Sequence, residues 1–351
     1  MPNSPPSVRR RSRTSVQVLL SILMHFTHPR TPAALITIFL FTQVLGFSRT
    51  SSYGPREFDE PHLTAIVAAY RPEIEAILNE IERREDTTIH ETLSLKGVKY
   101  HLGTFRDEPI VVFVTGVSIT NAAMTMQMAL DYFPIKQVLY SGIAGAVNPD
   151  LHPGDVTVPQ RWYYHDESVY SNPDGTGGYI LADYYQSTLD GHLERDISKD
   201  EFPNYENFGM IHPDEVYVIK EGWERSRNMP FFEATPKLME ASRAAVEAMG
   251  TISIDGREIK FLIGGNAVTG SVFLDNADYR RWTRSVWKAE VTEMESAAVG
   301  HVCFVNEVPW VIIRAVSDLA GGQEGKNVEN IYDDIASEHA TQFLFKLMEQ
   351  L

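Results

Sequence analysis

The sequence has a single cysteine and lacks the common motifs by which chains hold metal ions or nucleotides. Cys303 alone cannot form an intramolecular disulfide. HExxH, paired Cys/His ligands and calcium-binding loops are all missing, as are the P-loop and the GxSxG turn. We therefore expect a site that holds neither a metal ion nor a cofactor.

Basic residues are scarce once the first 56 positions are passed. The 351-residue chain carries 31 Lys and Arg against 47 Asp and Glu, which gives a net charge of −16. Seven of the arginines and none of the acids precede Glu57, which leaves 24 basic against 47 acidic residues, a charge of −23. Such an acidic chain argues against nucleic acid or an anionic membrane as a partner of the folded part.

Residues 1–56 differ from the rest and are interpreted as a targeting segment outside the fold. They contain a basic cluster, RRRSR (Arg9–Arg13), and an apolar run, AALITIFLFTQVLGF (Ala33–Phe47), that is short for a membrane span of about 20 residues. We expect a signal peptide that leads to the secretory pathway or the cell exterior. A membrane anchor, an organellar transit sequence and a misassigned start codon are the alternatives. Membrane contact, if any, is expected only through this segment.

From His62 onward, apolar strands alternate with helical patterns. Continuous apolar strands separated by helices predict an α/β fold: a three-layer α/β/α sandwich with a central mixed sheet, over residues 61–351. Within it, residues 168–236 are rich in Tyr, Asp, Gly and Asn and are expected to form an elaborated loop region over one end of the sheet. The expected strands are Leu63–Tyr70, Pro109–Gly116, Lys136–Val147 and Trp310–Gly322, the last two ending in glycine turns, and the expected helices are Pro72–Glu85, Asn121–Phe133 and Glu338–Leu351.

Polar or glycine residues follow several of the expected strands, and a helix start adds two acids. In sheets of this kind, ligands bind beyond the carboxyl ends of the strands. Four carboxylates should therefore converge at one end of the sheet, with few basic residues among them. The residues concerned are Glu73, Gly116, the stretch Ser141–Gly145, Glu293, Glu295, Ser317 and Asp318.

Each of these residues also has a purely structural interpretation. Thr292 and Glu295 have the spacing of a helix capping box, and Glu73 lies in the first turn of an expected helix, where acids are favoured anyway. Asp318 after Ser317 could be an ordinary helix cap, and the glycines could simply shape a turn. The combination of all of them is the stronger signal.

Four stretches together carry a resemblance to a known superfamily. They are SGIAGAVNPDLHPGDVTVP (Ser141–Pro159), GSVFLD (Gly270–Asp275), VTEMESAAVGHV (Val291–Val302) and VIIRAVSDLA (Val311–Ala320). In this order they resemble the nucleoside phosphorylase/nucleosidase superfamily. The closer likeness is to 5′-methylthioadenosine/S-adenosylhomocysteine nucleosidases and to plant bark-storage-type proteins, from about Leu63 to the C-terminus.

The resemblance implies a role for each matching residue. Met294 would pack on the face of the ribose, Glu295 would accept hydrogen bonds from its hydroxyls, and Glu293 would support them. Glu73 would position the attacking water. Asp318 would be the acid that protonates the purine at N7, with Ser317 beside it. Phe273 would stack on the base, and the Leu274 backbone would contact the adenine edge. The pocket would also be lined by Gly116, Gly142 and Ile143.

These residue types suit the cleavage of an N-glycosidic bond. Positive charge develops on the ribose, which an anionic pocket stabilises, and adenine leaves well only once N7 is protonated. A carboxyl group with a raised pKa can supply that proton. The small residues that follow Glu295 would let its helix approach the sheet closely.

The choice between water and phosphate depends on two positions. In the phosphorylases of this superfamily, an arginine precedes the glycine turn and a serine lies inside it, but here these positions hold Tyr140 and Ile143. Ile143 instead matches the bark-storage-type branch. With Glu73 at the place of the water-positioning acid, we expect a hydrolytic nucleosidase that releases adenine. A phosphorylase and a non-catalytic storage or binding protein are the alternatives. Arg314 is interpreted as part of an internal ion pair.

The resemblance also implies the partners of the chain. A nucleoside is the expected small-molecule partner. A homo-oligomer is expected, with a dimer as the first choice.

Overall fold

The computed structural model describes residues 62–181, 197–254 and 256–351. The predicted targeting segment, residues 1–56, lies outside these ranges. The described residues belong to one compact unit. No helix among them has both the length and the apolar character needed to cross a bilayer.

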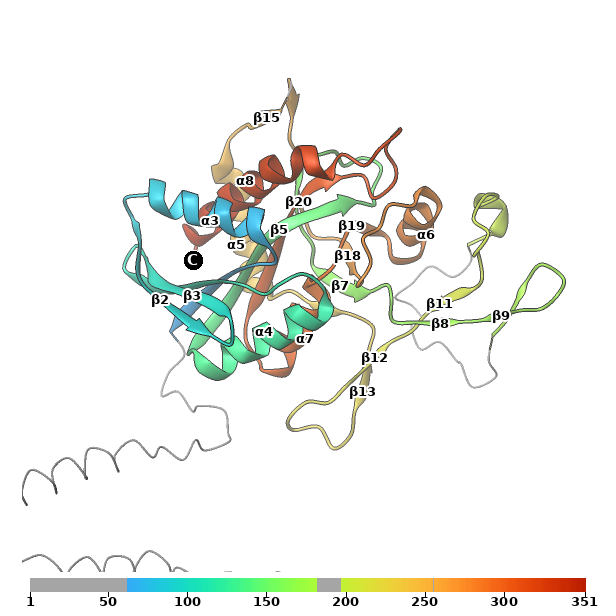
Figure 1. Cartoon of the computed structure of the whole chain (residues 1–351), viewed down its shortest axis with the longest axis horizontal. Coiled ribbons are helices and arrows are strands. Elements are labelled where there is room, and N and C mark those ends of the chain that lie inside the picture. The colour runs from blue at the N-terminus through green and yellow to red at the C-terminus, as the bar shows by residue number, and fades with distance from the viewer. Residues whose placement is uncertain (1–61, 182–196, 255) are drawn as a thin grey trace, which may run out of the picture. The chain divides into compact units, whose positions relative to one another are not determined.

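A mixed twelve-stranded sheet forms the middle layer (Figure 1). Its centre runs β4-β1-β5-β20, all parallel, and every residue of β1 and β20 is buried. β19 pairs with β5 in the antiparallel direction, which makes the sheet mixed as predicted. The strands are β1 (Leu63–Ala68), β2 (Thr87–Leu95), β3 (Val98–Phe105), β4 (Glu108–Val114), β5 (Ile135–Ala146), β6 (Val156–Val158), β7 (Arg161–Tyr164), β14 (Phe232–Glu233), β17 (Phe261–Ile263), β18 (Asn266–Thr269), β19 (Ala289–Glu293) and β20 (Trp310–Asp318).

Helices cover both faces of the sheet, which confirms the predicted three-layer sandwich. On one face, α8 (Glu329–Met348) packs against α3 (Arg71–Arg83) and α5 (Pro236–Met249); on the other, α4 (Ile119–Tyr132) packs against α7 (Ser296–Val305). A further helix, α6 (Ala277–Trp287), contacts β18 and β19. Because strands and helices alternate along the chain, each expected helix is found within a few residues of its predicted range, although α8 begins nine residues earlier.

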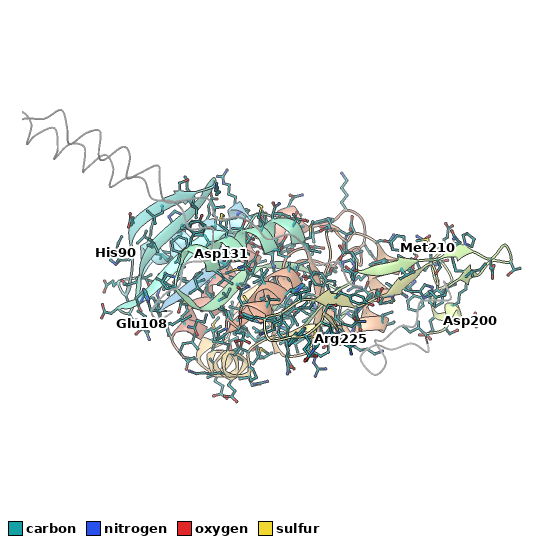
Figure 2. The ribbon with its side chains drawn as sticks, turned by 90° about the horizontal axis from the view of Figure 1, so that it is seen from below. His90, Glu108, Asp131, Asp200, Met210 and Arg225 are labelled. Atoms are coloured by element: carbon teal, nitrogen blue, oxygen red, sulfur yellow. The ribbon has the colours of Figure 1, made fainter. Side chains whose placement is uncertain are left out.

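The predicted elaboration consists largely of short two-stranded ribbons. In Figure 1, β8, β9 and β11 extend away from the sheet beyond α6, and in Figure 2 Asp200 and Met210 lie on the opposite side from His90. Its elements are β8 (Ser168–Tyr170), β9 (Asn172–Pro173), β10 (Tyr179–Ile180), the 3-10 turn η1 (Lys199–Glu201), β11 (Ile211–Pro213), β12 (Val216–Val218) and β13 (Arg227–Met229). A separate hairpin joins β15 (Ser253–Ile254) to β16 (Arg257–Glu258).

The predicted glycine turn after the third strand was wrong, because β5 continues through its glycines to Ala146. A Cβ atom on Gly142 would lie only 2.3 Å from Glu73 Oε1 and from Arg314 Nη1. Gly145 similarly has Asp318 Oδ1 3.0 Å from the place of its Cβ. These glycines therefore allow charged side chains to lie against the strand, rather than allowing the chain to turn.

The run of small residues in α7 does let this helix approach the sheet closely, as predicted. Gly300 faces the ring of Trp310, the first residue of β20, and a Cβ on Gly300 would lie 2.7 Å from that ring. Because α7 begins directly after Glu295, this contact helps to fix the position of the carboxylate.

We expect Gly300→Ala to destabilise the protein by about 1–3 kcal/mol, because the added methyl overpacks the contact with Trp310. The sign of this stability change is informative, since replacing Gly by Ala inside a helix ordinarily stabilises the helix by about 1 kcal/mol. The free energy of unfolding in urea measures the effect. The same substitution in a Trp310→Phe background, where the ring is smaller, should cost less. A Gly300→Ala variant more stable than the wild type would contradict this packing.

Candidate active site

A cavity of about 260 Å³ lies at one end of the sheet and collects most of the predicted site residues. The strand register explains why they meet. Gly145 of β5 pairs with Asp318 of β20 on one side and with Thr292 of β19 on the other. The chain segments that leave β19 and β20 therefore flank the same strand. The predicted residues on the cavity wall are Glu73, Ile143, Phe273, Leu274, Glu293, Met294, Glu295, Ser317 and Asp318.

Two predicted residues are not among those that line the cavity. Gly142 lies next to the side chains of Glu73 and Arg314, and Gly116 precedes the lining residue Val117. Gly142 thus lies behind two side chains that do line the cavity. Ala144 and Gly145, which belong to the predicted stretch Ser141–Gly145, also line the cavity, and the lining residues outside the predicted set are Ala69, Tyr70, Val117, Val272, Thr292, Arg314 and Glu329.

Glu293, rather than Glu295, caps helix α7. Its carboxylate accepts hydrogen bonds from the backbone N–H of Glu295 (2.9 Å) and from both the backbone N–H (2.9 Å) and the hydroxyl (2.8 Å) of Ser296. Thr269 Oγ1 donates to the same carboxylate. The predicted capping box between Thr292 and Glu295 is absent, since the Glu295 side chain makes no capping bond. Glu295 is thus free to face the cavity.

Arg314 is buried among three glutamates. It forms ion pairs with Glu293, with Glu295 at 3.3 Å and with Glu73 at 3.5 Å. Its Nε donates to Ser296 Oγ at 3.1 Å, and its Nη1 donates to the Ile143 carbonyl at 3.1 Å. Burial alone would lower the pKa of Arg314, but the three carboxylates raise it above its ordinary value, so the guanidinium stays charged. The predicted internal ion pair is therefore part of a four-residue cluster.

Glu295 presents a carboxyl group to the cavity, and the charged form of this group is costly to bury. The side chain accepts from the Ser118 backbone N–H at 2.8 Å and from Arg314 Nη2 at 3.3 Å. Burial, and next the nearby charge of Glu293, raise the pKa of Glu295 to about 8, although Arg314 opposes the shift. Ribose hydroxyls would add hydrogen bonds that favour its charged form.

Glu73 lies in the first turn of α3 and also lines the cavity. Its Oε2 accepts from the backbone N–H of Ala69 (2.6 Å) and of Tyr70 (3.3 Å), at the start of α3. Its Oε1 accepts from the backbone N–H of Ile143 at 2.8 Å. Burial raises the pKa of Glu73, partly offset by Arg314 and by these hydrogen bonds. These contacts confirm the structural interpretation of Glu73 at the helix start, and its role toward water stays a prediction.

Asp318 lies at the end of β20 and is 3% exposed. Its Oδ1 accepts from the Ala320 backbone N–H at 2.7 Å and from Asn327 Nδ2 at 3.3 Å, and its Oδ2 accepts from Ser317 Oγ at 2.9 Å. These bonds favour the charged form, but burial has the larger effect and raises the pKa of Asp318. A carboxyl group in this state can donate a proton closer to neutral pH than an ordinary aspartate can.

The apolar part of the cavity comes from the segment between β18 and α6 and from Met294. Phe273 is 55% exposed, whereas its neighbour Leu274 is only 8% exposed. An exposed aromatic ring beside a cavity has a free face for stacking. Met294 lies between the two glutamates, with its side chain at the cavity wall.

The charge of the cavity is strongly one-sided. Its lining includes five acids, Glu73, Glu293, Glu295, Asp318 and Glu329, and among the described lining residues Arg314 is the sole cation. Such a wall favours a positively charged transition state and offers a proton donor. It provides no unpaired cation for a phosphate dianion, because the Arg314 guanidinium is already bonded to carboxylates, a carbonyl and a hydroxyl.

Replacing Arg314 should be costly, and the cost should depend on pH. We expect Arg314→Met to destabilise the protein by about 3–5 kcal/mol, since it leaves buried carboxylates without their cation. The pKa values of Glu73 and Glu295, which burial already raises, would rise further in the folded state, and a carboxyl group whose folded pKa exceeds its unfolded value makes the protein less stable as pH rises between the two values. Because the pKa of Glu295 is already about 8 in the wild type, the deficit relative to the wild type should grow mainly around and above that value, between pH 7 and pH 9.

Urea unfolding at these two pH values measures the effect. Arg71→Met is the matched control, because Arg71 forms an exposed ion pair with Glu75, with 83% of the Arg71 side chain accessible. Exposed pairs contribute about 0–1 kcal/mol, so this variant should change little at either pH. Equal losses for Arg314→Met at pH 7 and pH 9 would contradict the electrostatic role of the arginine.

Comparison with known proteins agrees with this geometry. A relative of the chain is the 5′-methylthioadenosine/S-adenosylhomocysteine nucleosidase of Bacillus thuringiensis (strain Al Hakam), which is 24% identical over 288 residues, covering 82% of this chain and 98% of the relative. The structure of futalosine hydrolase from Helicobacter pylori superposes with a TM-score of 0.60 at 21% identity, covering 83% of this chain and 99% of the other.

A second solved structure is a Helicobacter pylori 5′-methylthioadenosine/S-adenosylhomocysteine nucleosidase in complex with a pyrrolidinol compound. It gives a TM-score of 0.61 at 20% identity, and the match covers 84% of this chain and all of the other. The model of the phosphorylase superfamily matches residues 64–351, which is nearly the whole described part of the chain. This match confirms the resemblance carried by the sequence motifs, and the chain belongs to the phosphorylase superfamily.

Proposed function

We propose that this protein hydrolyses the N-glycosidic bond of a purine nucleoside of the 5′-methylthioadenosine or S-adenosylhomocysteine type and releases adenine. The observation that carries the proposal is the wall of five carboxylates, whose single arginine is saturated by protein partners. The similarity to nucleosidases and to a futalosine hydrolase supports it.

The sugar would be held by Glu295 and Met294. As the bond from C1′ to the base breaks, positive charge spreads over the ribose ring. Charged Glu295 would accept hydrogen bonds from the ribose hydroxyls and stabilise this charge, with Met294 against the sugar face. Glu293 and Arg314 hold Glu295 in place: Glu293 caps the helix and Arg314 ties the two carboxylates together.

The purine would leave as a neutral base after protonation. Asp318 would donate its proton to N7, and its raised pKa keeps that proton available nearer neutral pH. Ser317 Oγ, 2.9 Å from Asp318 Oδ2, orients the carboxyl group. Phe273 would stack on the base, and the Leu274 backbone would lie at its edge.

Water, positioned by Glu73, would be the nucleophile. Its oxygen bonds to C1′ as the bond from C1′ to the purine nitrogen breaks, and Glu73 takes its proton while Asp318 protonates the base, so the products are adenine and a free sugar. The two positions at which phosphorylases have an arginine and a serine, here Tyr140 and Ile143, offer no free group to bind phosphate. The Tyr140 side chain is buried with its hydroxyl 2.9 Å from Thr115 Oγ1, and the Ile143 N–H is engaged by Glu73.

Two alternatives make different predictions. A phosphorylase would form ribose 1-phosphate, for which the described cavity wall offers no unpaired cation. A non-catalytic storage or binding protein would have no need for three buried carboxylates with raised pKa values at one cavity, since burying such charges is unfavourable. The predicted dimer stays a prediction.

Substitution of the three acids should affect base release in distinct ways. Asp318→Asn should lower kcat by about 10²–10⁴-fold and leave nucleoside binding measurable, because an amide keeps the shape but cannot donate the proton. Glu73→Gln should damage hydrolysis to a similar degree. Glu295→Gln should both raise KM and lower kcat, since a neutral amide stabilises a cationic sugar less well. Release of free base from methylthioadenosine measures all three.

Asp107→Asn is the matched control, because Asp107 is an exposed acid in the turn between β3 and β4. Its activity should equal that of the wild type. Near-normal turnover by Asp318→Asn would contradict the proposed acid. Failure of the wild type to cleave methylthioadenosine, S-adenosylhomocysteine, adenosine and inosine would favour the non-catalytic alternative.

A further inference from the structure

Two serine hydroxyls join separate loops beside the cavity and have no part in the chemistry described so far. Ser118 lies between β4 and α4, and Ser271 lies between β18 and α6, 153 residues later. Their hydroxyl oxygens are 2.8 Å apart, which is a hydrogen bond. The first loop contacts the residue that would grip the sugar, and the second carries the residues that would hold the base.

Ser118 has an unusual backbone conformation, with a φ of 87°. Residues other than glycine rarely adopt positive φ, and those that do are often held so at functional sites. In this conformation the Ser118 backbone N–H donates to Glu295 Oε1 at 2.8 Å. One residue therefore holds the proposed sugar-binding carboxylate through its backbone and reaches the second loop through its side chain.

Ser271 is fixed from the other side as well. Its backbone N–H donates to Asp166 Oδ2 at 2.7 Å, just after the end of β7. Phe273 follows two residues later and Leu274 three residues later, and both line the cavity. The segment that carries them is thus anchored near its start by Asp166 and by Ser118.

We propose that Ser118 and Ser271 act as a pair of positioning residues that sets the distance between the sugar-binding carboxylate and the base-binding loop. This inference rests on the proposed nucleosidase function. A nucleoside joins its base and sugar by one bond, so it needs both parts of the site at the correct separation, whereas free adenine needs the base-binding loop alone. The pair therefore favours the intact nucleoside over the released base.

The test compares Ser118→Ala, Ser271→Ala and the double variant in the full-length protein. Each single variant should raise KM for methylthioadenosine about three- to tenfold, the usual worth of one hydrogen bond, with a smaller effect on kcat. The inhibition constant of adenine should stay within about twofold. Because both substitutions remove the same bond, the double variant should be no worse than either single one.

Two further variants are controls: one keeps the hydroxyl at position 271, and the other removes a hydroxyl outside the site. Ser271→Thr keeps the hydroxyl and should retain the wild-type KM. Ser94→Ala removes an exposed hydroxyl from β2 and should change neither constant. Additive losses in the double variant, or equal weakening of adenine and nucleoside, would overturn the pair while cleavage by the wild type still supports the proposed function. No cleavage and no nucleoside binding by the wild type would overturn both.

Discussion

The arrangement of this site depends on one buried guanidinium. Arg314, 1% exposed at the centre of β20, lies against carboxylates from three separate segments: Glu73 in α3, Glu293 at the end of β19 and Glu295 before α7. Three carboxylates this close would repel one another and would be expensive to bury without a cation. With Arg314 among them, the helix cap Glu293, the proposed sugar-binding acid Glu295 and the proposed water-positioning acid Glu73 can share one small volume. The same engagement leaves the guanidinium without free donors for an anionic nucleophile.

Most of the fold could be predicted from the sequence because its central strands are continuous apolar runs. β1 and β20 are buried along their whole length, which is the pattern of a sheet covered on both faces. The end of β5 was mispredicted, because glycines such as Gly142 usually mark turns, and here they make room for distant side chains. That requirement is a tertiary contact and leaves no local signal. The targeting role of residues 1–56 stays a prediction.

Site residues that belong to a sequence motif could be predicted, whereas residues that reach the cavity only through the tertiary fold could not. Glu295 and Asp318 stand in recognisable stretches, so their convergence on one cavity could be expected. Glu329 could not, because it lines the cavity from the first turn of α8 and belongs to no motif. The division of work between Glu293 and Glu295 was also hidden. Both directly precede helix α7, and the hydrogen bonds that Glu293 accepts from Glu295 and Ser296 show which of them is the cap.

Determining whether water or phosphate is the nucleophile tests this account most directly. The acidic wall and the arginine, whose donors are all engaged by protein groups, both favour water. Cleavage of methylthioadenosine in ¹⁸O-labelled water containing unlabelled phosphate, followed by mass spectrometry of the sugar, identifies the atom that joins C1′. The account predicts a free sugar that carries one ¹⁸O. An unlabelled sugar 1-phosphate as the main product would contradict it.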